Sequence, residues 1–133
     1  MFIYLLIALG GAIGSMARYG ISEAIGLHSQ TPIPAIPWGT LVVNITGSFA
    51  IGFLSTYIGP GGKYFTSNEA RLFFITGICG GYTTFSAFSL ETLNLLRAGD
   101  TTRAAAYIAS SVGFCLLGTW LGFLLGTSLS GSR

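Results

Sequence analysis

The chain has 133 residues, of which 51% are hydrophobic and 8% carry a charge, and its formal net charge is +2. Soluble domains carry about 25% charged residues, so this composition excludes a water-covered surface and indicates an integral membrane protein. The small net charge, with no Lys/Arg cluster, excludes a nucleic-acid-binding surface.

Four apolar segments are each long enough to cross a membrane as a helix, which takes about 20 residues. They are about Phe2–Gly26, Trp38–Ile58, Glu69–Arg97 and Arg103–Thr127. The first lacks the basic region of a cleaved signal peptide, so we expect it to be retained. The sequence therefore predicts an all-α, multi-pass protein of the cell (inner) membrane, with residues 1–133 forming a single four-helix transmembrane domain.

The third segment contains a helix-breaking, hydroxyl-rich stretch, residues 80–89, which begins with Gly80-Gly81. A straight helix over Glu69–Arg97 would exceed a hydrocarbon core of about 30 Å by roughly 10 Å. Strong tilt or an unwound middle would accommodate this length, and the glycine pair favours the unwound middle. Non-helical backbone at membrane depth is tolerated only inside protein or beside a polar cavity, and such breaks commonly form ion sites.

The basic residues do not favour one orientation in the membrane. With four spans, one side of the membrane holds Lys63, Arg71 and Arg133, and the other holds Arg18, Arg97 and Arg103. The positive-inside rule gives no bias for three against three. This balance indicates that the chain inserts into the membrane in both orientations and assembles as an antiparallel dimer. The alternative is that the basic residues of one short chain are balanced by chance.

Small residues four positions apart mark helix faces along which backbones can approach closely. They occur at Gly10 and Gly14, at Ser48 and Gly52, and at Gly118, Gly122 and Gly126. Such faces join helices within one subunit or across a dimer, and we expect a mixture. Because four short helices enclose little space, a pathway favours a second subunit.

Two further helix faces carry polar groups that are costly against lipid. Thr40, Asn44, Gly47 and Ser48 share one face of the second span, and Tyr107, Ser111 and Cys115 share one face of the fourth. Interhelical hydrogen bonding and a ligand pathway explain the amide of Asn44 equally well. For the fourth-span stripe, a structural role is favoured.

Phe85 and Phe88 lie on one face of the helix that follows the glycine pair. Core packing is the usual role of two phenylalanines at this spacing, but their neighbours here are hydroxyl residues. Aromatic edges carry partial positive charge, so the two rings are also able to face an anion.

Asp, Glu, Lys and His are absent from the middle of the first, second and fourth spans. A proton-coupled carrier usually needs a titratable group at that depth. We expect Glu91, toward the end of the third span, to brace a neighbour. We expect Arg18 to snorkel to the interface, with a pore mouth as the alternative. No catalytic constellation occurs, which argues against an enzyme.

The sequence resembles the Fluc/CrcB family of fluoride channels over three of its four spans. The motifs that carry this resemblance are Gly11-x-x-Gly14-x-x-x-Arg18-Tyr19, Gly39-Thr40-Leu41-x-Val43-Asn44-x-x-Gly47-Ser48-Phe49 and Gly77-x-x-Gly80-Gly81-x-Thr83-Thr84-Phe85-Ser86-x-Phe88-Ser89-x-Glu91. The resemblance implies a fluoride-selective channel that exports fluoride passively and relieves fluoride toxicity. It also implies an antiparallel, dual-topology homodimer with two fluoride pathways.

The resemblance assigns residues to these sites. The backbone carbonyls of Gly80 and Thr83 would hold a structural Na⁺ at the dimer centre. The fluoride pathway would be lined by Thr40, Asn44, Phe85, Phe88, Tyr107 and Ser111. Two positions depart from the family pattern, because Ala87 stands where Thr is common and Cys115 where Ser is expected.

Two other functions compete with the channel. A small proton-coupled transporter of the multidrug type also has four spans and dual topology, but its membrane carboxylate would have to be Glu23, which lies near the end of the first span. A non-transporting assembly subunit would use its glycine faces only to bind another protein.

Overall fold

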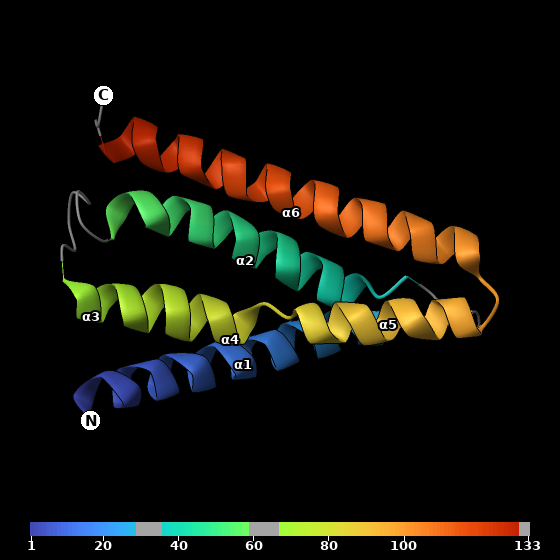
Figure 1. Ribbon diagram of the computed structural model, residues 1–133, viewed down its shortest axis with the longest axis horizontal. Coiled ribbons are helices and arrows are strands. Elements are labelled where there is room, and N and C mark those ends of the chain that lie inside the picture. The colour runs from blue at the N-terminus through green and yellow to red at the C-terminus, as the bar shows by residue number, and fades with distance from the viewer. Residues whose placement is uncertain (29–35, 59–66, 131–133) are drawn as a thin grey trace.

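The structure is a computed structural model that describes residues 1–28, 36–58 and 67–130, and all of the elements in these ranges are helices (Figure 1). In chain order they are α1 (Phe2–His28), α2 (Trp38–Tyr57), α3 (Asn68–Arg71), η1 (Leu72–Cys79), α4 (Gly80–Tyr82), α5 (Phe85–Arg97) and α6 (Thr101–Ser130). The element η1 is a π-helix. The third span consists of α3, η1, α4 and α5.

Within the described residues, four helical stretches are long and apolar enough to cross a membrane, which confirms the predicted class of a helical, four-span protein. They are Phe2–Gly26, Trp38–Tyr57, Asn68–Arg97 and Thr101–Ser130. The fourth span therefore starts before Arg103 and ends after Thr127, which were the two bounds expected from hydropathy. Lys63 and Arg133, which entered the charge comparison, lie outside the described residues.

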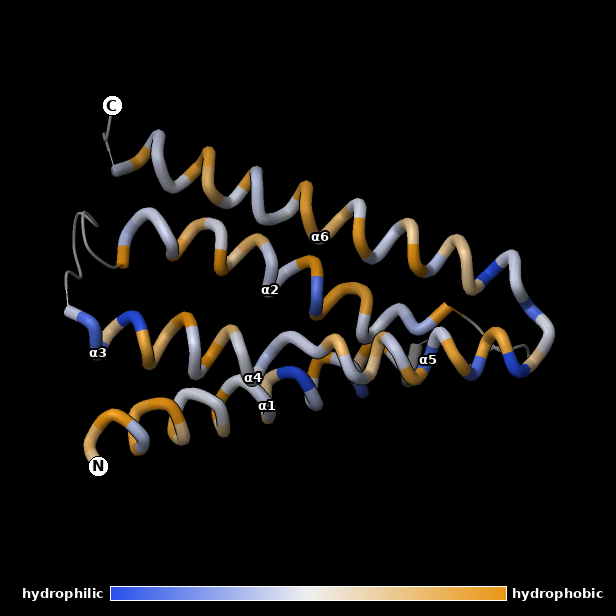
Figure 2. The backbone as a smooth tube through the Cα atoms, viewed as in Figure 1, coloured by the Kyte–Doolittle hydropathy of each residue, from blue (hydrophilic) through white to orange (hydrophobic). Residues whose placement is uncertain are grey.

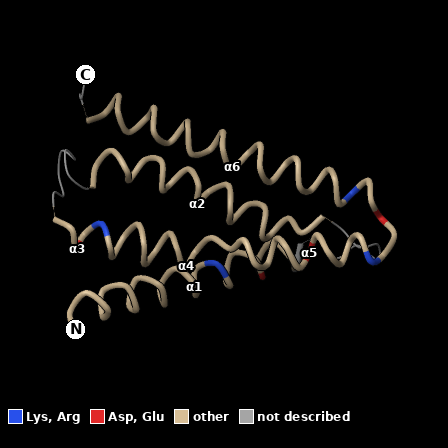
Figure 3. The backbone as a smooth tube through the Cα atoms, in the orientation of Figure 1, with Lys and Arg blue, Asp and Glu red and all other residues tan. Residues whose placement is uncertain are grey.

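The spans lie side by side, with α2 between α6 and the third span and with α1 packed on the third span (Figure 1). The two ends of the chain lie at the same end of this bundle. Most of each helix is apolar or weakly polar (Figure 2). Charged residues gather at the two ends of the bundle, with others on α1 and α5 (Figure 3).

Small residues bring α6 into close contact with α2 of the same chain. A Cβ atom at Gly122 would collide with the backbone carbonyl of Phe49, and one at Gly118 would lie 3.1 Å from the carbonyl of Ile45. From the other side, a Cβ at Gly52 would collide with the carbonyl of Thr119. Only a hydrogen atom fits at these positions, so the backbones of the two helices touch.

A second close contact joins α1 to the third span. A Cβ atom at Gly10 would lie 3.0 Å from Cα of Gly77, and one at Gly14 would lie 2.8 Å from the amide nitrogen of Tyr82. The three small-residue faces singled out in the sequence thus all have contacts within one chain. The expected share of these faces in contacts between subunits stays a prediction.

Two residues with extended backbone separate α4 from α5. Thr83 has φ −79° and ψ 155°, and Thr84 has φ −149° and ψ 113°. Gly80 has φ −65° and ψ −36°, so the glycine pair that suggested unwinding is itself helical, in α4. The extended residues are instead Thr83 and Thr84, because the polar groups of Thr84 bind partners outside the helix, described below.

A tight turn connects α5 to α6. Gly99 has a φ of 79°, a left-handed conformation that glycine adopts at little cost. The amide of Asp100 donates to the carbonyl of Leu95 at 3.0 Å, which closes the end of α5. The Asp100 carboxylate then accepts a 3.1 Å bond from the amide of Arg103 at the start of α6. This turn fixes how α5 lies along α6.

We predict that Gly122→Ala lowers the stability of the fold by about 1–3 kcal/mol, because the added methyl group overpacks a backbone contact. Gly113→Ala on the same helix is the matched control, since a Cβ there meets nothing within 4 Å and alanine favours a helix by up to about 1 kcal/mol over glycine. Thermal unfolding of the purified protein in detergent measures the difference. Equal midpoints for the two variants would contradict close backbone packing of α2 and α6.

Candidate functional site

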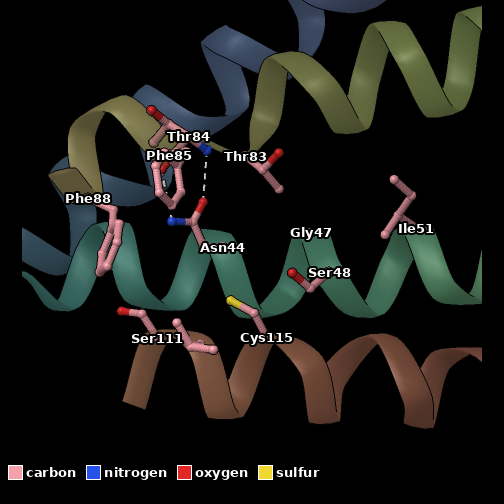
Figure 4. A pocket seen from close by; sticks show the side chains of 11 residues that line it. Asn44, Gly47, Ser48, Ile51, Thr83, Thr84, Phe85, Phe88, Ser111 and Cys115 are labelled. Atoms are coloured by element: carbon pink, nitrogen blue, oxygen red, sulfur yellow. Dashed lines mark hydrogen bonds between the residues drawn. The ribbon is translucent and has the colours of Figure 1, made fainter. Parts of the chain in front are cut away.

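The side chain of Asn44 on α2 binds both backbone groups of Thr84. Its Nδ2 donates to the carbonyl oxygen of Thr84 at 3.0 Å, and its Oδ1 accepts from the amide of Thr84 at 2.8 Å (Figure 4). This pair of hydrogen bonds satisfies an extended residue within an apolar span, where unpaired backbone groups cost several kcal/mol. Since an Asn amide carries two hydrogens, one remains for another acceptor.

The hydroxyl of Thr84 caps the helix that follows. Its Oγ1 accepts from the amide of Ala87 at 3.1 Å, the N-cap arrangement expected of Thr. In an uninterrupted helix, the amide of Ala87 would donate to the carbonyl of Thr83, and the amide of Thr84 would donate to the carbonyl of Gly80. Both amides donate to side-chain oxygens instead. The carbonyls of Gly80 and Thr83 therefore lose their usual helical donors.

A carboxylate links α5 to α2 and α6 beside this junction. Glu91 accepts a 2.7 Å hydrogen bond from the hydroxyl of Thr40 through Oε1 and another from the hydroxyl of Tyr107 through Oε2. Tyr107 is fully buried, and its ring centroid lies 5.3 Å from that of Phe88. Hydrogen bonds of neutral hydroxyls to a carboxylate are short and strong, so this cluster fixes the positions of all three helices.

A cavity of about 330 Å³ lies between α2, α6 and the start of α5. Its walls combine amide, hydroxyl, thiol, aromatic and aliphatic groups (Figure 4). The lining residues are Asn44, Gly47, Ser48, Ile51, Thr83, Thr84, Phe85, Phe88, Ser111, Val112 and Cys115. None of these side chains carries a charge, and most of the cavity surface is apolar, so a few amide and hydroxyl groups supply its polarity.

The two phenylalanines differ sharply in exposure. Phe88 is 9% exposed, whereas Phe85 is 78% exposed, and their ring centroids are 5.4 Å apart. Phe88 packs into the protein, and Phe85 stands at the rim of the cavity. A ring with this much exposed area at the centre of a span has to be covered by lipid or by another chain.

Most of the residues predicted for the pathway lie together. Asn44, Phe85, Phe88 and Ser111 line the cavity. Thr40 and Tyr107 lie next to it, on the carboxylate of Glu91.

Of the two predicted sodium ligands and Arg18, one residue lines the cavity and the other two do not. Thr83 lines the cavity, whereas Gly80 is exposed on α4. Arg18 lies on α1 and does not line the cavity; its Nε is buried and has no hydrogen-bond partner in the described part of the chain.

Comparison with known proteins assigns the chain to a family. The CrcB-like protein family (camphor resistance, CrcB) matches residues 5–123. The chain belongs to the CrcB family. This agrees with the resemblance seen in the sequence motifs.

Several curated relatives of this family are similar over nearly their whole length. The protein named fluoride-specific ion channel FluC of Opitutus terrae is 48% identical over 130 residues, which cover 98% of this chain and 96% of that protein. The protein of the same name from Rhodospirillum rubrum is 51% identical over 119 residues, covering 90% of each chain. The one from Rhizobium meliloti is 51% identical over 122 residues, covering 91% and 93%.

Thr84 is a member of the site that was not predicted from the sequence. Thr84 is the partner of Asn44 and the cap of α5. A usable signal was present, because Thr directly before a run of helix-forming residues is a typical N-cap. The pairing with Asn44 joins residues 40 positions apart, and local sequence does not encode it.

We predict that Asn44→Ala lowers the stability of the fold by about 1–3 kcal/mol, since it leaves both backbone groups of Thr84 buried without a partner. Asn94→Ala, on the exposed face of α5, is the control and is expected to change stability little. Thermal unfolding of both purified variants in detergent measures the effect. An Asn44→Ala midpoint equal to that of Asn94→Ala would show that the two hydrogen bonds do not hold the junction.

Proposed function

We propose that this chain is a fluoride-selective ion channel through which fluoride leaves the cell passively, so that fluoride toxicity is relieved. Its family and the names of its relatives support this function. Ion conduction is not an enzymatic reaction, and the chain is not an enzyme.

The uncharged cavity, with a few polar groups among aromatic and aliphatic walls, is the observation that carries this proposal. Fluoride is small and strongly hydrated, so a pathway has to replace its water without holding it too tightly. The free hydrogen of the Asn44 amide, the hydroxyl of Ser111 and the edges of the two phenylalanine rings supply partial positive charge. A Lys or Arg among the lining residues would bind the ion too strongly for rapid release, and the cavity contains neither.

The proton-coupled transporter is not favoured. Such a carrier needs a titratable group where its substrate binds. Its candidate, Glu23, is exposed and lies toward the end of α1, away from the cavity. The carboxylate nearest the cavity, Glu91, is occupied by two hydroxyl donors.

The proposed assembly is an antiparallel, dual-topology homodimer in the cell (inner) membrane. Phe85 projects from the cavity rim with 78% of its surface exposed, so one chain alone leaves this side of the pathway open. An antiparallel copy places the same surface against it through a two-fold axis. The balance of basic residues between the two sides of the membrane supports insertion in both orientations.

The proposed cofactor is a Na⁺ ion at the dimer centre, held by the carbonyls of Gly80 and Thr83. These residues fit the role, because Asn44 and Thr84 accept the amide hydrogens that the two carbonyls would otherwise receive. Half-helix ends with freed carbonyls bind Na⁺ in membrane proteins. A two-fold copy would present the same pair of carbonyls. Bound Na⁺ would join the subunits and leave the fluoride cavity uncharged.

The test of the function is fluoride efflux from liposomes that contain the purified dimer, followed with a fluoride electrode. We expect fast, valinomycin-dependent release of fluoride and no matching release of chloride. This result would establish selective, charge-carrying transport. Efflux that required a proton gradient and an organic cation would favour the transporter instead, and no efflux from folded dimers would refute the channel.

We predict that Phe85→Ile or Phe88→Ile abolishes fluoride efflux while leaving a folded dimer, because the aliphatic side chain lacks an electropositive edge. Phe114→Ile on α6 is the matched control, since Phe114 lies outside the cavity lining and is 52% exposed. Size-exclusion chromatography verifies the dimers before flux is measured. Wild-type rates in both cavity variants would remove the rings from the mechanism.

We predict that replacing Na⁺ with N-methylglucamine throughout purification lowers the thermal stability of the dimer, and that Na⁺ restores it. A ligand at 100 times its Kd stabilises a protein by about 2.7 kcal/mol. Adding K⁺ in place of Na⁺ is the control for ionic strength. Identical midpoints in all three salts would argue against a bound Na⁺.

A further inference from the structure

Cys115 places a thiol on the wall of the cavity. It lies on α6, is partly exposed and lines the cavity opposite α2. Figure 4 shows its sulfur pointing from α6 toward α2, between Asn44 and Ser48. The thiol therefore faces the space that the proposed pathway uses.

A second, independent observation on this wall is a buried polar group that has no partner within the described part of the chain. Ser111 lies one turn before Cys115 and is only 6% exposed. Its Oγ is buried and has no hydrogen-bond partner in the described part of the chain. A buried hydroxyl without a partner costs about 1–3 kcal/mol, so a polar ligand or water in the cavity would stabilise it. Cys115 faces the same cavity as this hydroxyl.

The other cysteine differs from Cys115 in both its exposure and its position. Cys79 is 4% exposed, lies in η1 and does not line the cavity. Reagents dissolved in the cavity reach Cys115 and not Cys79, because reactivity of a thiol requires both ionisation and access.

We propose that Cys115 is a covalent modification site for thiol-specific electrophiles of the thiosulfonate and disulfide class, and that an adduct there obstructs ion passage. The second half of this proposal rests on the proposed channel function. With methyl methanethiosulfonate, the Cys115 thiolate attacks the divalent sulfur of the reagent. The new S–S bond forms as the sulfur–sulfonyl bond breaks, methanesulfinate leaves with the electron pair, and the thiol proton goes to water.

The adduct occupies space on the cavity wall. The methylthio group added to Cys115 projects from α6 toward α2, into the cavity that Asn44 and Ser48 also line. It also replaces a weak S–H donor with a group that cannot donate. Both changes oppose the passage of a dehydrated anion along this wall.

The experiment treats the full-length wild-type dimer and the variants Cys115→Ser and Cys79→Ser, all in liposomes, with methyl methanethiosulfonate. Intact-mass spectrometry counts adducts, and fluoride efflux is compared with each variant's own untreated rate. We expect one adduct per chain and an efflux reduced by about tenfold or more in the wild type and in Cys79→Ser, as for an obstructed pore. Cys115→Ser should gain no adduct and lose no flux, and dithiothreitol should reverse both effects.

Each result decides the proposal. Failure to label Cys115 in folded dimers, or labelling that leaves efflux unchanged, would overturn it. Loss of sensitivity in Cys79→Ser rather than in Cys115→Ser would assign the effect to the other cysteine and overturn it as well. If the untreated wild type shows no fluoride efflux, the channel function fails and with it the obstruction of ion passage, while mass spectrometry still decides whether Cys115 is the modification site.

Discussion

The two hydrogen bonds between Asn44 and the backbone of Thr84 are the constraint on which the rest of the site depends. They allow two extended residues to exist inside an apolar span, where lipid offers no hydrogen-bond partner. They also end α4 and start α5, which sets the direction of Phe85 and Phe88.

The same interaction has effects in two directions. Toward α2 and α6, it places hydroxyl, amide and aromatic groups around one cavity. Away from the cavity, the Asn44 amide leaves the carbonyl of Gly80 without its helical donor, and the Thr84 hydroxyl does the same for the carbonyl of Thr83. The junction thus presents polar groups to the cavity on one side and carbonyls without helical donors on the other. The carboxylate of Glu91 accepts hydrogen bonds from Thr40 and Tyr107 and so holds α5 against α2 and α6.

Much of this architecture was accessible from the sequence, because hydropathy and helical spacing act locally. The four spans follow from apolar length, and the polar faces that meet at the cavity follow from the spacing of Asn44 and Ser111. The extended residues were harder to place. The glycine pair suggested unwinding at Gly80-Gly81, but the amide of Asn44 determines the position, and Thr83 and Thr84 are extended instead. Such a choice between distant partners depends on the tertiary fold and not on local propensity.

The close backbone contacts of α6 with α2, and of α1 with the third span, have a consequence for biogenesis. Because these interfaces form within one chain, they do not depend on a partner subunit. In the proposed antiparallel dimer, pairing of subunits would be a separate event that depends on the density of chains in the bilayer. Only encounters between oppositely inserted copies would then be productive, so the ratio of the two insertion products would limit the yield of working pairs.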